Sequence, residues 1–195
     1  MVINSNLPIK KPLPVTTTVI VVAVGMNGLL FMMNDALSLP LFFDSFFTIM
    51  ISAFFGLVPG IITGLLSNLF YEVLMGFPGN FYPFALVNMF TAIATAVMVR
   101  KGFLNTPIGV IWIIFVLTLG NSILGAVIVT FLFEGFTNLV ADDIVKAIIH
   151  TGNSIFTSAL FTRILINFTD KGIAVLLTYF LYRHFSKMDR TSSTP

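Results

Sequence analysis

Residues 42–76 read FFDSFFTIMISAFFGLVPGIITGLLSNLFYEVLMG, and this stretch decides the class of fold. It carries two acidic residues, Asp44 and Glu72, and no basic residue. Gly56, Gly60 and Gly64 recur at every fourth position, so on a helix they share one face. A lipid bilayer suits such a segment, because positions that face lipid favour apolar side chains.

The composition of the whole chain leads to the same conclusion. Hydrophobic residues make up 57% of the 195 positions and charged residues 9%, whereas soluble domains carry about 25% charged residues. Twenty-two phenylalanines exceed what a soluble fold of this length could bury. The sequence therefore predicts an integral membrane protein. The absence of cysteine excludes disulfides and cysteine metal sites.

Apolar runs predict a bundle of six transmembrane helices within residues 16–186, flanked by short tails at 1–15 and 187–195. A helix needs about 20 apolar residues to cross the hydrocarbon core. The expected spans are Thr16–Met33, Leu41–Leu57, Ile61–Met75, Phe84–Val99, Ile108–Phe133 and Gly172–Phe185. The stretch Ile144–Phe168 is also apolar but striped with polar residues, and the sequence alone leaves open whether it crosses. We expect Asp142–Asn167 to form an outer, partly helical segment that covers the bundle without crossing it.

The basic residues orient the chain, since cytoplasmic loops carry an excess of lysine and arginine. Six crossings with both termini in the cytoplasm place seven of the ten basic residues inside: Lys10, Lys11, Arg100, Lys101, Arg183, Lys187 and Arg190. Lys146, Arg163 and Lys171 fall on or near the outer side. A seventh crossing would put the basic C-terminus outside, so we expect six.

Under this model residues 42–76 form a tight helical hairpin with its inner turn at Leu57–Gly60. Pro59 lacks an N–H group and Gly60 tolerates positive φ, which suits both to a turn. Small residues at every fourth position let helix backbones approach closely. Two interpretations of these glycines stay open. They pack only the two helices of this hairpin, or the face that carries Gly64 also contacts a partner subunit.

Polar side chains inside the membrane need hydrogen-bond partners or a watery cavity. Those of the predicted spans lie near the midplane or in the outer half, and Asp143, Lys146, His150, Asn153 and Thr157 form a stripe beside them. We expect an outward-opening pocket whose substrate-binding candidates are Asn27, Asp44, Asn68, Glu72, Asn88, Asn121, Asn153, Asn167 and Lys171. Structural roles stay open: Asp44 could cap a helix and Asn121 could bond a neighbouring helix.

Several functions lack their motifs. The sequence contains no G-x-x-x-x-G-K-[ST] phosphate loop, no H-E-x-x-H, no C-x-x-C and no G-x-S-x-G. There is no basic stripe for nucleic acid. His150 is interpreted as an interfacial residue rather than a metal ligand. We therefore expect no enzyme activity, no cofactor, no metal and no nucleic-acid partner.

Four stretches carry a family resemblance: AVGMNGLL (23–30), LPLFFDSFFTIMISAFFGLVPGIITGLLSNL (39–69), YPFALVN (82–88) and TDKGIAVLL (169–177). Their order and spacing resemble the S component of energy-coupling factor (ECF) vitamin transporters, in particular the riboflavin-type branch. The resemblance implies six membrane helices in a bacterial plasma membrane. It also implies capture of an extracellular vitamin, with riboflavin the leading candidate.

The resemblance further implies partners, namely a transmembrane coupling protein and two cytoplasmic ATPases, which agrees with the missing phosphate loop. The family's coupling surface, commonly A-x-x-x-A, corresponds here to Ala23-Val-Gly-Met-Asn27. Ala23, Asn27 and Gly64 are thus the coupling-interface candidates. Related segments also occur in bacterial signalling proteins, so a small membrane sensor or assembly partner without transport is the alternative. A stand-alone secondary transporter often contains repeats, and none is evident.

Overall fold

The computed structural model describes residues 13–137 and 139–191, so most of the predicted tail 1–15 and the last four residues of the tail 187–195 lie outside the described residues. This part of the chain is helical and contains no strand, as the sequence predicts. Its elements are α1 (Leu13–Ala36), α2 (Phe46–Phe55), α3 (Leu57–Leu74), η1 (Tyr82–Phe84), α4 (Ala85–Arg100), η2 (Phe103–Asn105), α5 (Pro107–Leu132), α6 (Ala141–Ile149) and α7 (Ile155–Thr191).

Five of these helices are long and apolar enough to cross a membrane: α1, α3, α4 with its preceding turn, α5 and α7. Large apolar side chains are exposed along them, as Val21 (64%), Ile108 (70%) and Phe131 (75%) illustrate. Exposure of this kind is unfavourable in water and favourable in lipid. The helices therefore indicate a membrane protein.

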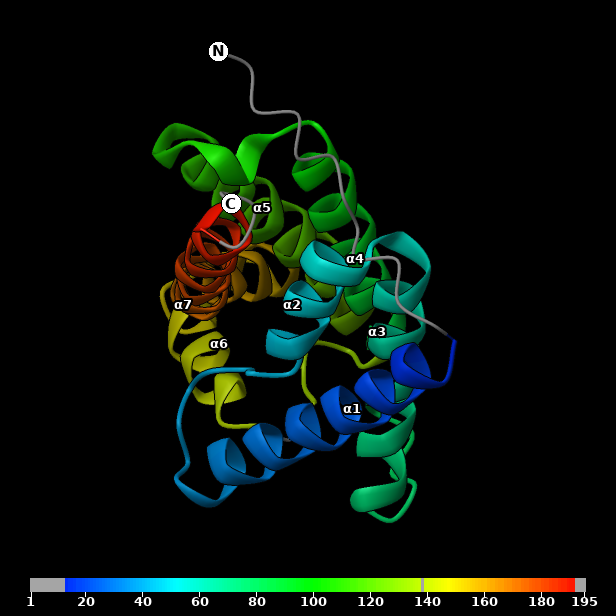
Figure 1. The fold of residues 1–195 in the computed structure, drawn as a ribbon. Coiled ribbons are helices and arrows are strands. Elements are labelled where there is room, and N and C mark those ends of the chain that lie inside the picture. Colours follow the sequence, from blue (N-terminus) through cyan, green and yellow to red (C-terminus); the bar gives the residue numbers. More distant parts are fainter. Residues whose placement is uncertain (1–12, 138, 192–195) are drawn as a thin grey trace.

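The second predicted span, Leu41–Leu57, differs from the structure. Only Phe46–Phe55 is helical, and ten residues at about 1.5 Å each reach about half of a ~30 Å hydrocarbon core. Residues 37–45 precede it as non-helical chain, and we call them the α1–α2 connection. Helix α2 contacts α1, α3, α4 and α7 and lies at the centre of the bundle in Figure 1.

The hairpin turn lies one residue before the predicted one. Gly56 makes it with φ of 91°, a conformation that side chains disfavour, and α3 already begins at Leu57. Pro59 thus sits in the first helical turn, where its missing N–H costs nothing. Gly60 packs α3 against α2, because a Cβ atom there would lie 2.1 Å from Ser52 Oγ. The glycine spacing therefore serves close helix packing.

The end of the chain also differs from the prediction. The last helix is continuous from Ile155 to Thr191, so the predicted span Gly172–Phe185 is only its later part. The predicted outer segment Asp142–Asn167 is divided between α6 and the first turns of α7. Thr157, the residue of the predicted polar stripe that lies on α7, is half-buried, whereas Arg163, Asn167 and Lys171 further along α7 are buried in the bundle.

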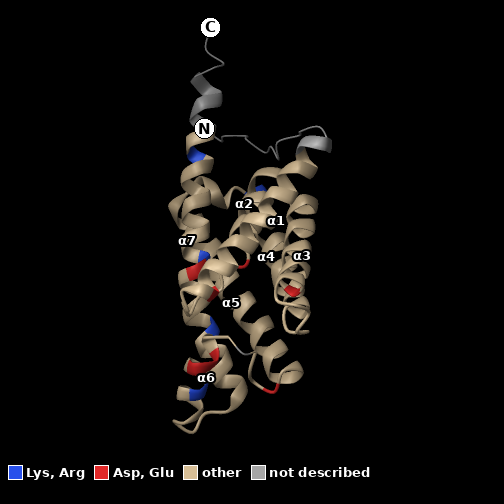
Figure 2. Cartoon of the chain, turned by 90° about the horizontal axis from the view of Figure 1, so that it is seen from below, with Lys and Arg blue, Asp and Glu red and all other residues tan. Residues whose placement is uncertain are grey.

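The bundle has two unlike ends. Figure 2 shows the first turns of α1 and the late turns of α7 at one end, with α6 and the acidic residues toward the other. An apolar core joins α2, α5 and α7 at the first end, built on Ile49, Ala53, Leu104, Val110, Ile113, Leu117, Ala174, Val175 and Tyr179. The buried charged side chains lie outside this core, and they are Glu72, Asp142, Arg163, Asp170 and Lys171.

Candidate binding pocket

A pocket lies in the half of the bundle toward α6. Its cavity volume is about 60 Å³, which is room for about four to six water molecules. The lining residues are Phe31, Asn34, Asp35, Leu39, Leu41, Phe42, Asp44, Asn68, Tyr71, Phe81, Phe84, Val87, Asn121, Gly125, Leu139, Val140, Ala141, Arg163, Asn167 and Lys171.

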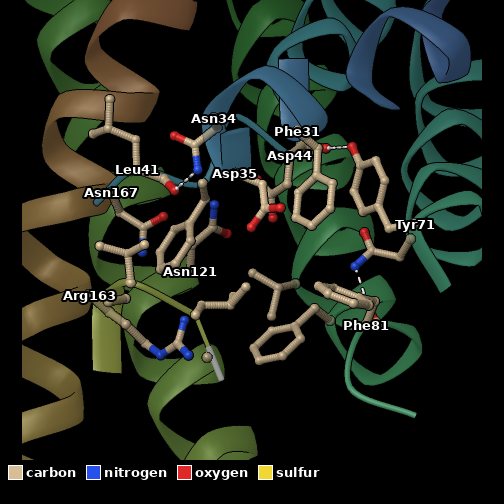
Figure 3. Close-up of a pocket in the computed structure, with 18 of the residues that line it drawn as sticks. Phe31, Asn34, Asp35, Leu41, Asp44, Tyr71, Phe81, Asn121, Arg163 and Asn167 are labelled. Atoms are coloured by element: carbon tan, nitrogen blue, oxygen red, sulfur yellow. Dashed lines mark hydrogen bonds between the residues drawn. The ribbon is translucent and has the colours of Figure 1, made fainter. Parts of the chain in front are cut away.

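The α1–α2 connection forms one side of the pocket, and side chains from distant helices satisfy its backbone. Asn34 Nδ2 donates to the Leu41 carbonyl at 2.7 Å (Figure 3). The Asp44 carbonyl accepts from the Tyr71 hydroxyl at 2.6 Å and from Asn88 Nδ2 at 3.2 Å. Non-helical backbone at membrane depth is tolerated where protein groups bond it or where it lines a cavity. The connection meets both conditions.

A buried ion cluster fixes the end of the same connection to α7. Lys171 Nζ donates to Asp170 Oδ2 at 2.6 Å, to Asp44 Oδ1 at 3.1 Å and to Ser45 Oγ at 2.5 Å. Asp170 Oδ1 accepts the Phe43 N–H at 3.2 Å. The Lys171 side chain is 3% exposed, so each of its three donors is used within the protein.

Three rings make an aromatic wall on the side of α1 and α3. Phe31 stacks on Tyr71 with centroids 4.7 Å apart and an interplanar angle of 18°. Phe81 meets Phe31 edge-on at 5.2 Å. Figure 3 shows these rings across the cavity from Arg163 and Asn167. Such a wall offers stacking area to a flat ligand.

Arg163 on α7 forms the opposite, polar side. Its guanidinium carbon lies 5.2 Å from the ring centroids of both Phe42 and Phe84. It also packs on α5 at Gly125, where an added Cβ atom would lie 3.1 Å from Arg163 Cδ. The glycine therefore leaves the space that the arginine fills, and Figure 3 shows the guanidinium pointing into the cavity.

Two asparagines present unused acceptors to the pocket. Asn34 Oδ1 is buried and accepts no hydrogen bond among the described residues. Asn167 Nδ2 donates to Ser122 Oγ at 3.1 Å, and no donor within residues 13–137 and 139–191 bonds its carbonyl oxygen. The Asn34 oxygen is enclosed by protein atoms, so of the two only the Asn167 oxygen is placed to receive an N–H or O–H group of a ligand.

Five of the nine predicted binding residues line this pocket: Asp44, Asn68, Asn121, Asn167 and Lys171. The amide of Asn68 donates to the Phe81 carbonyl at 3.0 Å and accepts from Asn88. Asn121 Nδ2 donates to Thr91 Oγ1 at 2.8 Å and thereby links α5 to α4. The structural interpretation considered for Asn121 therefore holds, although its side chain also faces the cavity.

Asn27 and Glu72 are not pocket-lining residues, and their side chains form hydrogen bonds that connect neighbouring elements of the fold. Asn27 is fully buried; it accepts the Phe47 N–H at 2.8 Å and donates to Thr48 and Ser67, so it joins α1, α2 and α3.

The Glu72 carboxylate accepts three backbone N–H groups of the loop that leads into α4. Those of Phe81 and Tyr82 lie at 2.8 and 3.0 Å, and the third belongs to Gly79. These three hydrogen bonds satisfy the Glu72 carboxylate, so its burial in a membrane helix needs no ligand as an explanation. Asn88 supports the connection from outside the cavity, and Asn153 is exposed on the loop before α7, where it bonds Thr151 at 2.8 Å.

The three coupling-interface candidates are all internal in this structure. Ala23 is 3% exposed and Asn27 fully buried. Gly64 packs against α4, where an added Cβ atom would lie 2.9 Å from the Asn88 carbonyl oxygen. None of the three is therefore accessible to a partner subunit in this structure.

Sequence reasoning missed Arg163, Tyr71, Phe31 and Asn34 as pocket residues. Arg163, Asn167 and Lys171 follow a four-residue step and so share one helix face. Asn167 and Lys171 were predicted to bind, so this step could also have identified Arg163. Tyr71 and Phe31 could not be told from ordinary lipid-facing aromatics.

Comparison with known proteins gives no assignment, because no protein-family model, no curated protein and no solved structure matches the chain.

Proposed function

We propose that this chain is a substrate-capturing membrane subunit of an ECF-type importer. It binds a vitamin-like small molecule from the outside. The observation that carries the proposal is the pocket, which combines an aromatic wall with unused hydrogen-bonding groups. Such a combination of apolar surface and a few convergent polar groups is typical of small-molecule sites.

The proposal includes six crossings with both termini in the cytoplasm. Five long helices alone would place the two ends of the chain on opposite sides. Figure 2, however, has the first turns of α1 and the late turns of α7 at one end. The α1–α2 connection and α2 together supply the sixth crossing, as a short helix continued by non-helical chain. Discontinuous helices of this kind surround substrate sites in many transporters.

The missing phosphate loop supports a role that depends on partner ATPases. By the family resemblance, a transmembrane coupling protein and two cytoplasmic ATPases supply the energy for release inside. The coupling surface would lie on exposed apolar helix faces rather than on Ala23, Asn27 or Gly64, which are internal.

Calorimetry against a vitamin panel that includes riboflavin tests the capture function. We expect one compound to bind the intact protein, and Asn167→Ala to weaken its binding roughly three- to tenfold through the loss of one or two hydrogen bonds. Asn153→Ala is the matched control, because it removes the same group from the exposed loop before α7. Unchanged affinity in Asn167→Ala would contradict the pocket assignment, and no binding by any vitamin would contradict the proposed function.

A further inference from the structure

Arg163 differs from the other buried cation of the pocket in having no acidic partner. It is 8% exposed, and no carboxylate of the described residues lies within ion-pair distance of it. The acids of the surrounding elements are occupied elsewhere. Asp44 is bonded to Lys171, and Asp142 accepts the Thr137 N–H at 2.7 Å.

Asp142 and Asp44 act on Arg163 electrostatically, but neither contacts it. A buried cation without a contacting carboxylate is unfavourable, because the protein interior replaces its hydration poorly. The rings of Phe42 and Phe84 compensate part of that cost through cation–π contacts. These rings interact with the guanidinium, but they supply no acceptor for its N–H groups. Those groups converge on the cavity, where nothing in residues 13–137 and 139–191 accepts from them.

The free donors of a guanidinium form a rigid fork that matches two oxygens of one carboxylate or phosphate. Across the cavity, the aromatic wall of Phe31, Tyr71 and Phe81 offers its surface to a flat ring. The two features together define a molecule with an oxyanion at one end and an aromatic ring at the other.

We infer that the captured molecule is an aromatic organic acid whose carboxylate or phosphate pairs with Arg163. This inference rests on the proposed capture function and narrows its substrate class. It favours a charged vitamin over a neutral one, so riboflavin 5′-phosphate fits the pocket chemistry better than riboflavin itself.

Matched pairs of ligands test the charge requirement in the full-length protein. Nicotinate with nicotinamide, and riboflavin 5′-phosphate with riboflavin, each differ mainly in the anionic group, and the two pairs distinguish a carboxylate from a phosphate. We expect the anionic member of at least one pair to bind wild-type protein roughly ten- to hundredfold more tightly, as charge-assisted hydrogen bonds do. Arg163→Gln should abolish that preference, with the larger loss of affinity falling on the anionic member.

Lys146→Gln is the control, since it removes a positive charge from the same half of the bundle outside the pocket. Its ammonium pairs with Asp143 at 3.1 Å, and both side chains are exposed. We expect this variant to keep the wild-type preference. Arg163→Lys retains the positive charge but loses the two parallel N–H donors of the guanidinium. This variant should keep only part of the preference for the anionic ligand.

The wild-type comparison needs no variant, so misfolding of Arg163→Gln would not leave the inference untested. If both members of each pair bind wild type equally, the anion requirement is overturned while the capture function stands. If wild type binds none of the four compounds and nothing in the wider vitamin panel, the capture function fails and the inference fails with it.

Discussion

Lys171→Met is expected to destabilise the protein by about 3–5 kcal/mol, the loss typical when one partner of a buried ion pair is removed. The substitution leaves Asp44 and Asp170 facing each other without the ammonium that lies 3.1 and 2.6 Å from their oxygens. The extended chain before α2 would lose its attachment to α7 at the same time. We expect a large drop in melting temperature in detergent, or no folded protein at all.

Lys146→Met provides the matched control for this experiment. Lys146 also contacts an aspartate at 3.1 Å, but its side chain is 55% exposed and that of Asp143 is 78% exposed. Exposed pairs of this kind contribute about 0–1 kcal/mol, so this variant should melt close to wild type. Combining Lys171→Met with Asp170→Asn should restore part of the loss. Equal melting of the two single lysine variants would show that the buried cluster does not stabilise the fold.

Gly64→Leu is expected to have the second large effect. A Cβ atom at this position would lie 2.9 Å from the Asn88 carbonyl oxygen and 3.0 Å from its carbon, and a helix backbone cannot rotate away as a side chain can. Overpacked cores typically lose about 1–3 kcal/mol, and a leucine placed against backbone should exceed that range. Separation of α3 from α4 would also disturb Asn68 and Asn88, which are bonded across this interface.

Gly25→Leu is the comparison for this glycine, because a Cβ atom on its exposed side of α1 meets nothing within 4 Å. It changes the same residue types in another membrane helix. We expect Gly25→Leu to express and melt like wild type, and Gly64→Leu to be lost during purification. A Gly64→Leu protein as stable as Gly25→Leu would rule out close backbone packing at this site.

Much of the fold follows from local patterns in the sequence. Long apolar runs predict α1, α3, α4 and α5 within a few residues, because lipid imposes the same requirement on each span. The glycine spacing predicts close packing for the same kind of reason. Both signals are contained in a single segment and need no knowledge of its neighbours.

The break before α2 could not be predicted in this way. Its non-helical backbone is bonded by Asp170 and Lys171 from 127 residues away, and no local pattern records such a contact. Glu72 presented the converse difficulty. A carboxylate at membrane depth suggested a ligand, whereas backbone N–H groups of the following loop satisfy it.

The sequence predicted Asn167 and Lys171 on α7 as binding residues, and both line the pocket, but it did not identify Arg163 one step earlier on the same face. Periodicity identifies which residues share a face, and it does not say whether that face meets water, lipid or a cavity. Arg163 therefore gained its significance only from the position of α5 against α7.

Labelling of single-cysteine variants with a membrane-impermeant maleimide tests the central claim, which is an outward-opening pocket in a chain that crosses six times. The natural sequence contains no cysteine, so each introduced thiol is unique. Asp35→Cys probes the mouth of the pocket, Thr151→Cys the loop after α6, and Asn105→Cys the turn before α5 at the opposite end; all three positions are exposed.

In intact cells we predict labelling of Asp35→Cys and Thr151→Cys from outside, while Asn105→Cys reacts only after the membrane is permeabilised. The opposite pattern, with Asn105→Cys labelled in intact cells and Asp35→Cys protected, would place the pocket on the cytoplasmic side and contradict the account.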